Sequence, residues 1–112
     1  MTVPIFDKAD ALERMMDDEE LLLEIIELYN DDTADLIQQL VLAAETSDQR
    51  LLHRAAHTVK GSSANIGAMR IMSVATLMEK ECVEGNLQRA ALYIPELTSE
   101  LEVFKEEAAK AF

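Results

Sequence analysis

Residues 48–67 read DQRLLHRAAHTVKGSSANIG, and this segment predicts one amphipathic helix with a defined beginning and end. Asp48 is a residue type that caps helix N-termini, and Gly67 is the type that ends helices in a left-handed conformation. We therefore expect a helix over 49–66. At about 100° per residue, its small and apolar side chains share one face, which is predicted to be buried: Leu52, Ala55, Ala56, Val59, Ser62, Ser63 and Ile66.

The opposite face of this helix carries His57, which lies roughly 160° from the centre of the buried face and should therefore point into water. Lys60 and Gly61 follow at i+3 and i+4, on the same side as His57. A glycine inside a helix costs about 1 kcal/mol relative to alanine. Gly61 therefore predicts that something bulky must approach the imidazole ring.

The rest of the chain also has helical periodicity, with no strand-like alternation. Short turns separate the segments, so we expect neighbouring helices to be antiparallel. Pro95 predicts a kink or a helix boundary in the last segment. The long second segment contains no Gly or Pro and is predicted to continue through 30–33. The expected helices cover 7–16, 17–44, 49–66, 68–84 and 87–110, after an N-terminal tether over 1–6.

Cap residues support these limits. Asp7 is expected to cap the first helix, and Asp17 with Glu20 three residues later resembles a capping box for the second. Gly85 is expected to end the fourth helix and Asn86 to cap the next one. The sequence thus predicts an all-α fold, an antiparallel up-and-down four-helix bundle with a short extra N-terminal helix that covers one end.

The composition is that of one globular domain over residues 1–112, with 49% hydrophobic and 29% charged residues. The net charge of −12 argues against binding to nucleic-acid phosphates. No apolar run approaches the roughly 18 residues of a membrane span, and no signal-like pattern begins the chain. We therefore expect no membrane insertion and a cytoplasmic location. The single cysteine, Cys82, is expected to be an unreactive part of the core.

The charge is unevenly distributed along the chain. Positions 49–78 contain no Asp or Glu but four cationic residues, Arg50, Arg54, Lys60 and Arg70. A neutral imidazole is a competent nitrogen nucleophile, and a phosphoryl group on it forms a labile N–P bond. The cationic segment would accept an anionic group, and Lys60 could contact its oxygens. These features favour a phosphoryl carrier.

The run HxxKGSSANIGA over 57–68 resembles the signature of the histidine-containing phosphotransfer (HPt) domains of bacterial multistep phosphorelays, of the hybrid sensor kinase type. Features outside the run agree with this resemblance: Phe6-Asp7, the Leu- and Ile-rich segment before it, Glu79 and Gly85-Asn86. The resemblance implies that His57 accepts a phosphoryl group at Nε2 from a receiver-domain aspartyl phosphate and passes it to another receiver. Lys60 would be the phosphoryl charge partner, and the receiver docking face would comprise Gly61, Ala64, Arg54, His53 and Arg50.

The resemblance also implies the partners of the chain, which are response-regulator receiver domains and a covalently linked or separate hybrid sensor histidine kinase. The chain would be a monomer and a carrier without kinase activity of its own. It would bind no cofactor, since Mg²⁺ is expected on the receiver. Both a free-standing shuttle and a domain of a hybrid kinase fit the sequence.

Two other functions are compatible with these residues. His53 and His57, spaced i, i+4, could bind a transition metal, although positions 49–78 offer no carboxylate to complete the site and their cations would repel a metal ion. The second is a docking module that holds a signalling partner without phosphorylation, although such a module would have no evident use for an exposed histidine beside Gly61.

Overall fold

The computed structural model describes residues 2–112, and this part of the chain forms six helices and no strand. The all-helical class predicted from the sequence is confirmed. The helices are α1 (Lys8–Arg14), α2 (Glu19–Glu45), α3 (Gln49–Ile66), α4 (Met69–Val83), α5 (Leu87–Ala91) and α6 (Ile94–Lys110).

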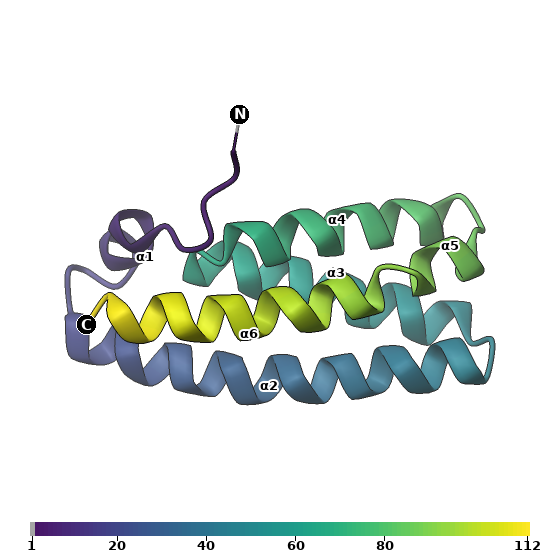
Figure 1. Ribbon diagram of the computed structural model, residues 1–112, viewed down its shortest axis with the longest axis horizontal. Coiled ribbons are helices and arrows are strands. Elements are labelled where there is room, and N and C mark those ends of the chain that lie inside the picture. Colours follow the sequence, from purple (N-terminus) through teal and green to yellow (C-terminus); the bar gives the residue numbers. More distant parts are fainter. Residues whose placement is uncertain (1) are drawn as a thin grey trace.

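The four long helices, α2, α3, α4 and α6, lie side by side along the 41 Å long axis of the molecule (Figure 1). Helix α3 packs against α2 and α4, and α6 packs against the same two helices on the other side. The short helix α1 lies at one end beside α2 and α3, and α5 lies at the other end (Figure 1). One face of α3 therefore stays free of neighbouring helices.

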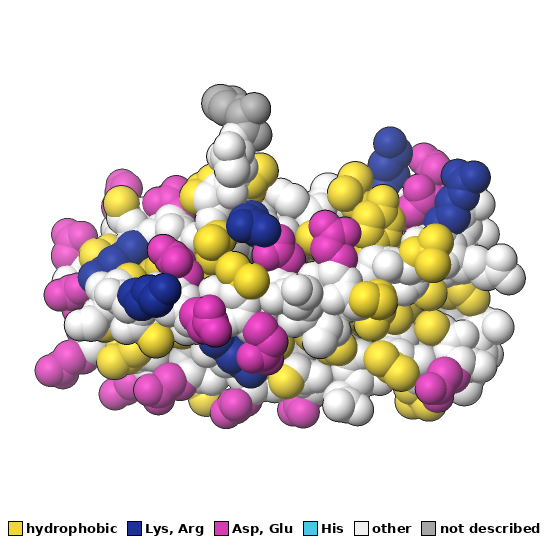
Figure 2. All heavy atoms as spheres, in the orientation of Figure 1, with side chains coloured by type: hydrophobic (Ala, Val, Ile, Leu, Met, Phe, Trp, Pro, Cys, Tyr) yellow, Lys and Arg dark blue, Asp and Glu magenta, His cyan; other side chains and the backbone are white. Residues whose placement is uncertain are grey.

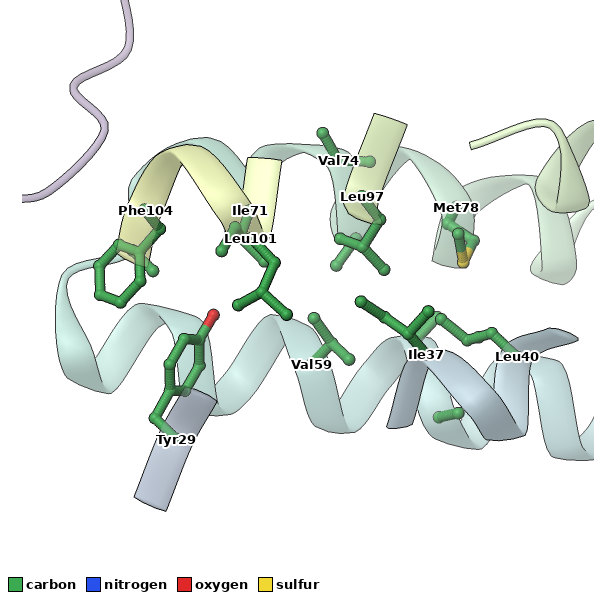
Figure 3. Close-up of a cluster of buried hydrophobic side chains, with 14 of the residues drawn as sticks. Tyr29, Ile37, Leu40, Val59, Ile71, Val74, Met78, Leu97, Leu101 and Phe104 are labelled. Carbon is green, nitrogen blue, oxygen red and sulfur yellow. The ribbon is translucent and has the colours of Figure 1, made fainter. Parts of the chain in front are cut away.

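One hydrophobic cluster lies between these helices. Figure 3 shows side chains from all four long helices pointing toward one another, with Leu101 and Phe104 above Tyr29. The rings of Phe104 and Tyr29 meet edge to face, with centroids 5.4 Å apart. Burial of such side chains is the main source of stability in a domain of this size.

Helix α2 is continuous, as its sequence predicts, and its buried positions follow at intervals of three or four residues: Leu22, Ile26, Tyr29, Thr33, Ile37, Leu40 and Ala43. Inside the bundle the Tyr29 hydroxyl lies 2.6 Å from Ser63 Oγ of α3. Burial raises the pKa of Tyr29 to about 12, although the hydrogen bond with Ser63 acts in the opposite direction. The predicted burial of Ser63 is confirmed. Ser62 lies at the edge of the buried face and is only partly buried, contrary to the prediction.

The cap of α2 differs from the prediction. The capping residue is Asp18, whose side chain accepts a hydrogen bond from the Leu21 amide at 3.0 Å. Met16 and Asp17 both have positive φ, 56° and 63°, and lie in the turn between α1 and α2. Asp17 therefore belongs to the turn, and the predicted capping box of Asp17 and Glu20 is wrong.

Pro95 marks a helix boundary and not a kink. The short helix α5 ends at Ala91, and α6 begins at Ile94 with Pro95 in its first turn. The missing amide hydrogen of proline causes no loss there, since the first amides of a helix have no intrahelical acceptor. The structure thus decides between the two possibilities that the sequence left open.

The predicted tether over 1–6 is only partly correct. Met1 lies outside the described residues, and residues 2–4 are exposed, but Ile5 and Phe6 pack against the hydrophobic cluster. The Phe6 ring meets Phe104 edge to face, with centroids 5.4 Å apart. The last part of the tether thus belongs to the packed structure, because an aromatic side chain next to an apolar surface gains by burial.

Both predicted caps of α3 are confirmed. The Asp48 side chain accepts a hydrogen bond from the Leu51 amide at 3.0 Å, and Gly67 ends the helix with a φ of 79°. The Gly67 carbonyl accepts a hydrogen bond from the Asp7 amide at 2.8 Å. A Cβ atom on Gly67 would lie 2.6 Å from the Asp7 carbonyl oxygen. Position 67 therefore needs glycine for its backbone angle and for this contact.

Replacing two glycines separates these two requirements. Gly85 also has a positive φ, 82°, but a Cβ atom there would meet nothing within 4 Å. We expect Gly85→Ala to cost about 1–2 kcal/mol of unfolding free energy from left-handed strain, and Gly67→Ala to cost a further 1–3 kcal/mol, about the cost of overpacking. Urea unfolding followed by circular dichroism measures both, and equal losses would contradict the role given to the Asp7 contact.

Candidate functional site

His57 lies on the face of α3 that no other helix covers, and its side chain is 66% exposed. The prediction that it points into water is confirmed. Its Nδ1 atom lies 2.5 Å from Oε2 of Glu79, a residue of α4. A carboxylate can only accept, so Nδ1 carries the proton and donates it to Glu79.

Lys60 uses the other oxygen of the same carboxylate. Its Nζ atom donates to Glu79 Oε1 at 2.5 Å. The Glu79 side chain is only 14% exposed, whereas Lys60 is 32% exposed. One largely buried carboxylate thus joins the two residues that the sequence analysis selected, and it fixes both from the neighbouring helix.

The charge of Glu79 is maintained by these two partners. Burial raises the pKa of Glu79, but the hydrogen bonds from Lys60 and His57, together with their charges, outweigh that effect and leave the pKa below its ordinary value. Glu79 is therefore ionised at neutral pH.

The hydrogen bond to Glu79 determines which imidazole nitrogen is reactive. With the proton held on Nδ1, the lone pair of the neutral ring is on Nε2. The carboxylate also stabilises the positive charge that develops on the ring when Nε2 attacks an electrophile. The arrangement is that of an oriented nitrogen nucleophile open to solvent.

Gly61 has no internal reason to be glycine. A Cβ atom there would meet nothing within 4 Å, and its backbone is helical. The open space beside His57 is therefore free for a group that comes from outside the chain. Of the other predicted docking residues, Arg50, His53 and Arg54 are exposed and Ala64 is partly buried.

Two of the four cationic side chains in positions 49–78 form ion pairs with carboxylates in the folded domain. Lys60 pairs with Glu79, and Arg70 pairs with Glu100 of α6, with Nε and Oε2 2.8 Å apart. Among the described residues, no carboxylate lies within 4.0 Å of the guanidinium of Arg50 or Arg54. The positive surface near His57 thus consists of two arginines and not of four cations.

Glu79 is the residue that sequence reasoning did not assign to the site. The sequence indicated Glu79 only through the family resemblance. The lack of a carboxylate to complete a metal site with His53 and His57 applied only to positions 49–78. Glu79 could have been identified by its position on α4, four residues after Ala75 and three before Cys82, both of which are buried. A carboxylate at the edge of a buried stripe needs a partner.

A groove also lies beside this face, between α1, α2 and α3, and the sequence analysis did not predict it. Leu28 in its wall is 62% exposed. On α3 the groove is lined by Ser62, which directly follows Gly61, and by Asn65 one turn later. Its lining residues are Arg14, Met15, Ile25, Leu28, Tyr29, Asp32, Ser62 and Asn65.

Other surfaces carry less chemistry. The face of the molecule that includes α6 shows intermixed acidic, basic and apolar side chains and no histidine (Figure 2). In the described part of the chain, no group of three or more His, Cys, Asp and Glu side chains is arranged to hold a metal ion. No helix within residues 2–112 has the length and apolar character needed to cross a membrane.

Comparison with known proteins gives this site a family. The family model described as "Hpt domain" matches residues 24–108, about three quarters of the chain. The chain therefore belongs to the family of Hpt, or histidine-containing phosphotransfer, domains. Its biochemical class is that of a phosphoryl carrier in a phosphorelay.

Individual relatives agree with this assignment. The crystal structure of histidine-containing phosphotransfer protein B from Pseudomonas aeruginosa PAO1 is 27% identical, has a TM-score of 0.80, and is matched over 97% of this chain and 98% of its own. The protein MtHPt2 from Medicago truncatula, at 22% identity and a TM-score of 0.81, shares the fold over 95% of this chain and 76% of its own.

A curated relative is the phosphorelay intermediate protein rdeA from Dictyostelium discoideum, which is 29% identical over 103 residues. The match covers 89% of this chain and 40% of rdeA, so the chain spans about two fifths of that protein's length. Since these relatives include eukaryotic proteins, the resemblance is not confined to bacteria.

The link between Glu79 and its partners predicts a pH-dependent stability. Because the pKa of folded Glu79 is lowered, its contribution is present above the unfolded carboxyl value of about 4.3 and is lost as the pH falls through the lower folded value. We expect Glu79→Gln to lose about 1 kcal/mol at pH 7 and to approach the wild type below about pH 4. Urea unfolding at several pH values measures this, and a difference that is constant from pH 7 to 3 would contradict it.

Proposed function

We propose that His57 is the phosphoacceptor of this domain and that the reactive atom is Nε2. The observation that carries the proposal is the hydrogen bond from Nδ1 to Glu79 Oε2, which leaves Nε2 unprotonated on a side chain that is 66% exposed. The donor is the aspartyl phosphate of a receiver domain, and the acceptor in the next step is the aspartate of another receiver.

The transfer step conserves charge and protons. The Nε2 lone pair forms the N–P bond while the P–O bond to the receiver aspartate breaks, and the electron pair of that bond stays on the departing carboxylate. The Nδ1 proton remains shared with Glu79, which balances the positive charge of the phosphorylated ring. The return step to the second receiver is the reverse of this one.

Lys60 has two roles in this proposal. In the unphosphorylated domain it holds Glu79 Oε1, and its remaining ammonium hydrogens are available for the oxygens of an arriving phosphoryl group. The two roles are compatible because Lys60 and His57 lie on the same side of α3 and an ammonium group has three N–H donors.

The receiver docks on the exposed face of α3. Gly61 and Ala64 allow close approach, and the unpaired Arg50 and Arg54, together with His53, suit an acidic surface on the receiver. The groove between α1, α2 and α3 extends this face and offers an apolar contact near Leu28. The antiparallel bundle of α2, α3, α4 and α6, closed at one end by α1, serves as the rigid support.

The chemistry of nucleotide and metal belongs to the partners. The domain acts as a monomeric carrier without kinase activity of its own, and the receiver supplies Mg²⁺, which neutralises phosphoryl charge during transfer. Both a free-standing shuttle and a domain attached to a hybrid sensor kinase would use the same face.

Phosphotransfer from a labelled receiver tests the acceptor. We expect the wild-type domain, incubated with a receiver carrying labelled aspartyl phosphate and Mg²⁺, to gain acid-labile, base-stable label. His57→Gln should gain none, because it removes the nucleophile and keeps a polar side chain on the helix. His53→Gln is the matched control and should still be labelled at pH 8.

Two outcomes would contradict the proposal. Equal labelling of wild type and His57→Gln would mean that another residue accepts the phosphoryl group. Unlabelled wild type that still binds its receivers would favour the docking module, in which the same face holds a partner without transfer.

Gly61 gives an independent test, because stability and transfer should change in opposite directions. Gly61→Ala should stabilise the domain by about 0.5–1 kcal/mol, since glycine is a poor helix former and the added methyl group meets nothing. Gly61→Leu should keep the helical circular dichroism and reduce the transfer rate by about 100-fold, because it shifts the receiver away from Nε2. Unimpaired transfer by the folded Gly61→Leu variant would overturn the docking role of this position.

A further inference from the structure

Glu79 has a third neighbour besides His57 and Lys60. His53 lies one turn before His57 on α3, and its Nε2 is 3.7 Å from Glu79 Oε2, the oxygen that accepts from His57. The centroids of the two imidazole rings are 6.4 Å apart. The distance to Glu79 is that of an ion pair and not of a hydrogen bond. Oε2 has two acceptor sites, so His53 can approach it without displacing His57.

The surroundings of His53 contain few charged groups. Its side chain is 46% exposed, and it shares a shallow pocket with Gln49 and Arg50 of α3 and Cys82 and Val83 of α4. The charged groups on this side are therefore the Arg50 guanidinium and the carboxylate of Glu79, with Lys60 on the other oxygen of that carboxylate. Histidine is the residue type that gains and loses a proton between pH 5 and 8.

The charge balance around Glu79 differs between the two forms of His57. In the unphosphorylated domain, Lys60 and Glu79 neutralise each other, so a proton on His53 adds one uncompensated positive charge. A phosphoryl group brings up to two negative charges to the neighbouring ring. The ring itself becomes positively charged when Nε2 carries that group, so the net change is about one negative charge. The same proton on His53 is then attracted by the new charge and by Glu79 together.

We propose that His53 is a positioning residue for the phosphorylated state: in its protonated form it pairs with Glu79 Oε2 and places a positive charge beside the phosphoryl group on His57. This inference rests on the proposed function of His57. Because linkage between two binding events is reciprocal, phosphorylation of His57 and protonation of His53 favour each other by the same factor. Relative to a variant with no titratable side chain at position 53, the domain therefore retains its phosphoryl group better as the pH falls.

Nuclear magnetic resonance of the two imidazole rings tests this linkage directly. The domain is titrated from pH 5 to 8.5 before and after reaction with phosphoramidate, a small donor whose own P–N bond breaks with release of ammonia as the N–P bond to His57 forms. We expect the proton affinity of His53 to rise about threefold to tenfold on phosphorylation of His57. This is the size of effect for opposite charges near a protein surface on two rings whose centroids are 6.4 Å apart.

Variants at position 53 connect the linkage to transfer. With phosphoramidate as phosphoryl donor, so that receiver docking plays no part, the phosphorylated fraction of wild type relative to His53→Gln should be equal at pH 8 and about threefold higher at pH 5.5. Titration of the donor affects both proteins equally and cancels in this ratio, and the resonance titration gives the protonation of His57 in each protein. His53→Lys, which carries its charge throughout, should keep the advantage at pH 8. If His53 had a purely structural role, His53→Gln would change the phosphorylated fraction by the same factor at every pH.

The outcomes separate this inference from the proposed function. If His57 becomes phosphorylated and the proton affinity of His53 stays within a factor of two, the role of His53 is overturned and the carrier function stands. Parallel pH profiles for wild type and His53→Gln would overturn it in the same way. If neither phosphoramidate nor a receiver labels His57, both proposals fail.

Discussion

The carboxylate of Glu79 is the interaction on which the rest of the site depends. It comes from α4, is largely buried, and accepts hydrogen bonds from His57 and Lys60 of α3. An unpaired charge in such a position would be strongly unfavourable, so the packing of α4 on α3 requires both partners to turn toward it. The orientation of the imidazole ring, its tautomer and the exposure of Nε2 all follow from this requirement.

The bundle keeps that geometry fixed because every element of the site lies on a helix. Helix α3 is capped by Asp48 at one end and stopped by Gly67 at the other, and Gly67 is held against the backbone of Asp7. Sites built on helices hold their side chains more precisely than sites on loops. Gly61 and Gly67 lie six residues apart and have opposite roles, since Gly67 satisfies a contact inside the chain and Gly61 leaves a space outside it.

Much of the fold could be predicted because its signals are local. The caps of α3, the continuity of α2 and the boundary at or near Pro95 depend on residue type and on the period of 3.6 residues. The incorrect details lie where neighbouring elements compete. Asp17 has the right residue type for a cap, but it lies in the turn between α1 and α2 with a positive φ, and Asp18 caps the helix.

The sequence by itself determined that the chain is helical, that His57 and Gly61 share an exposed face, and that the motif belongs to a phosphotransfer domain. Only the tertiary structure decided which charges meet. Glu79 is 22 residues from His57 along the chain, and Glu100 is 30 residues from Arg70. Their pairing depends on the rotation and offset of one helix against the next, which side-chain packing across the whole core sets and no local pattern encodes.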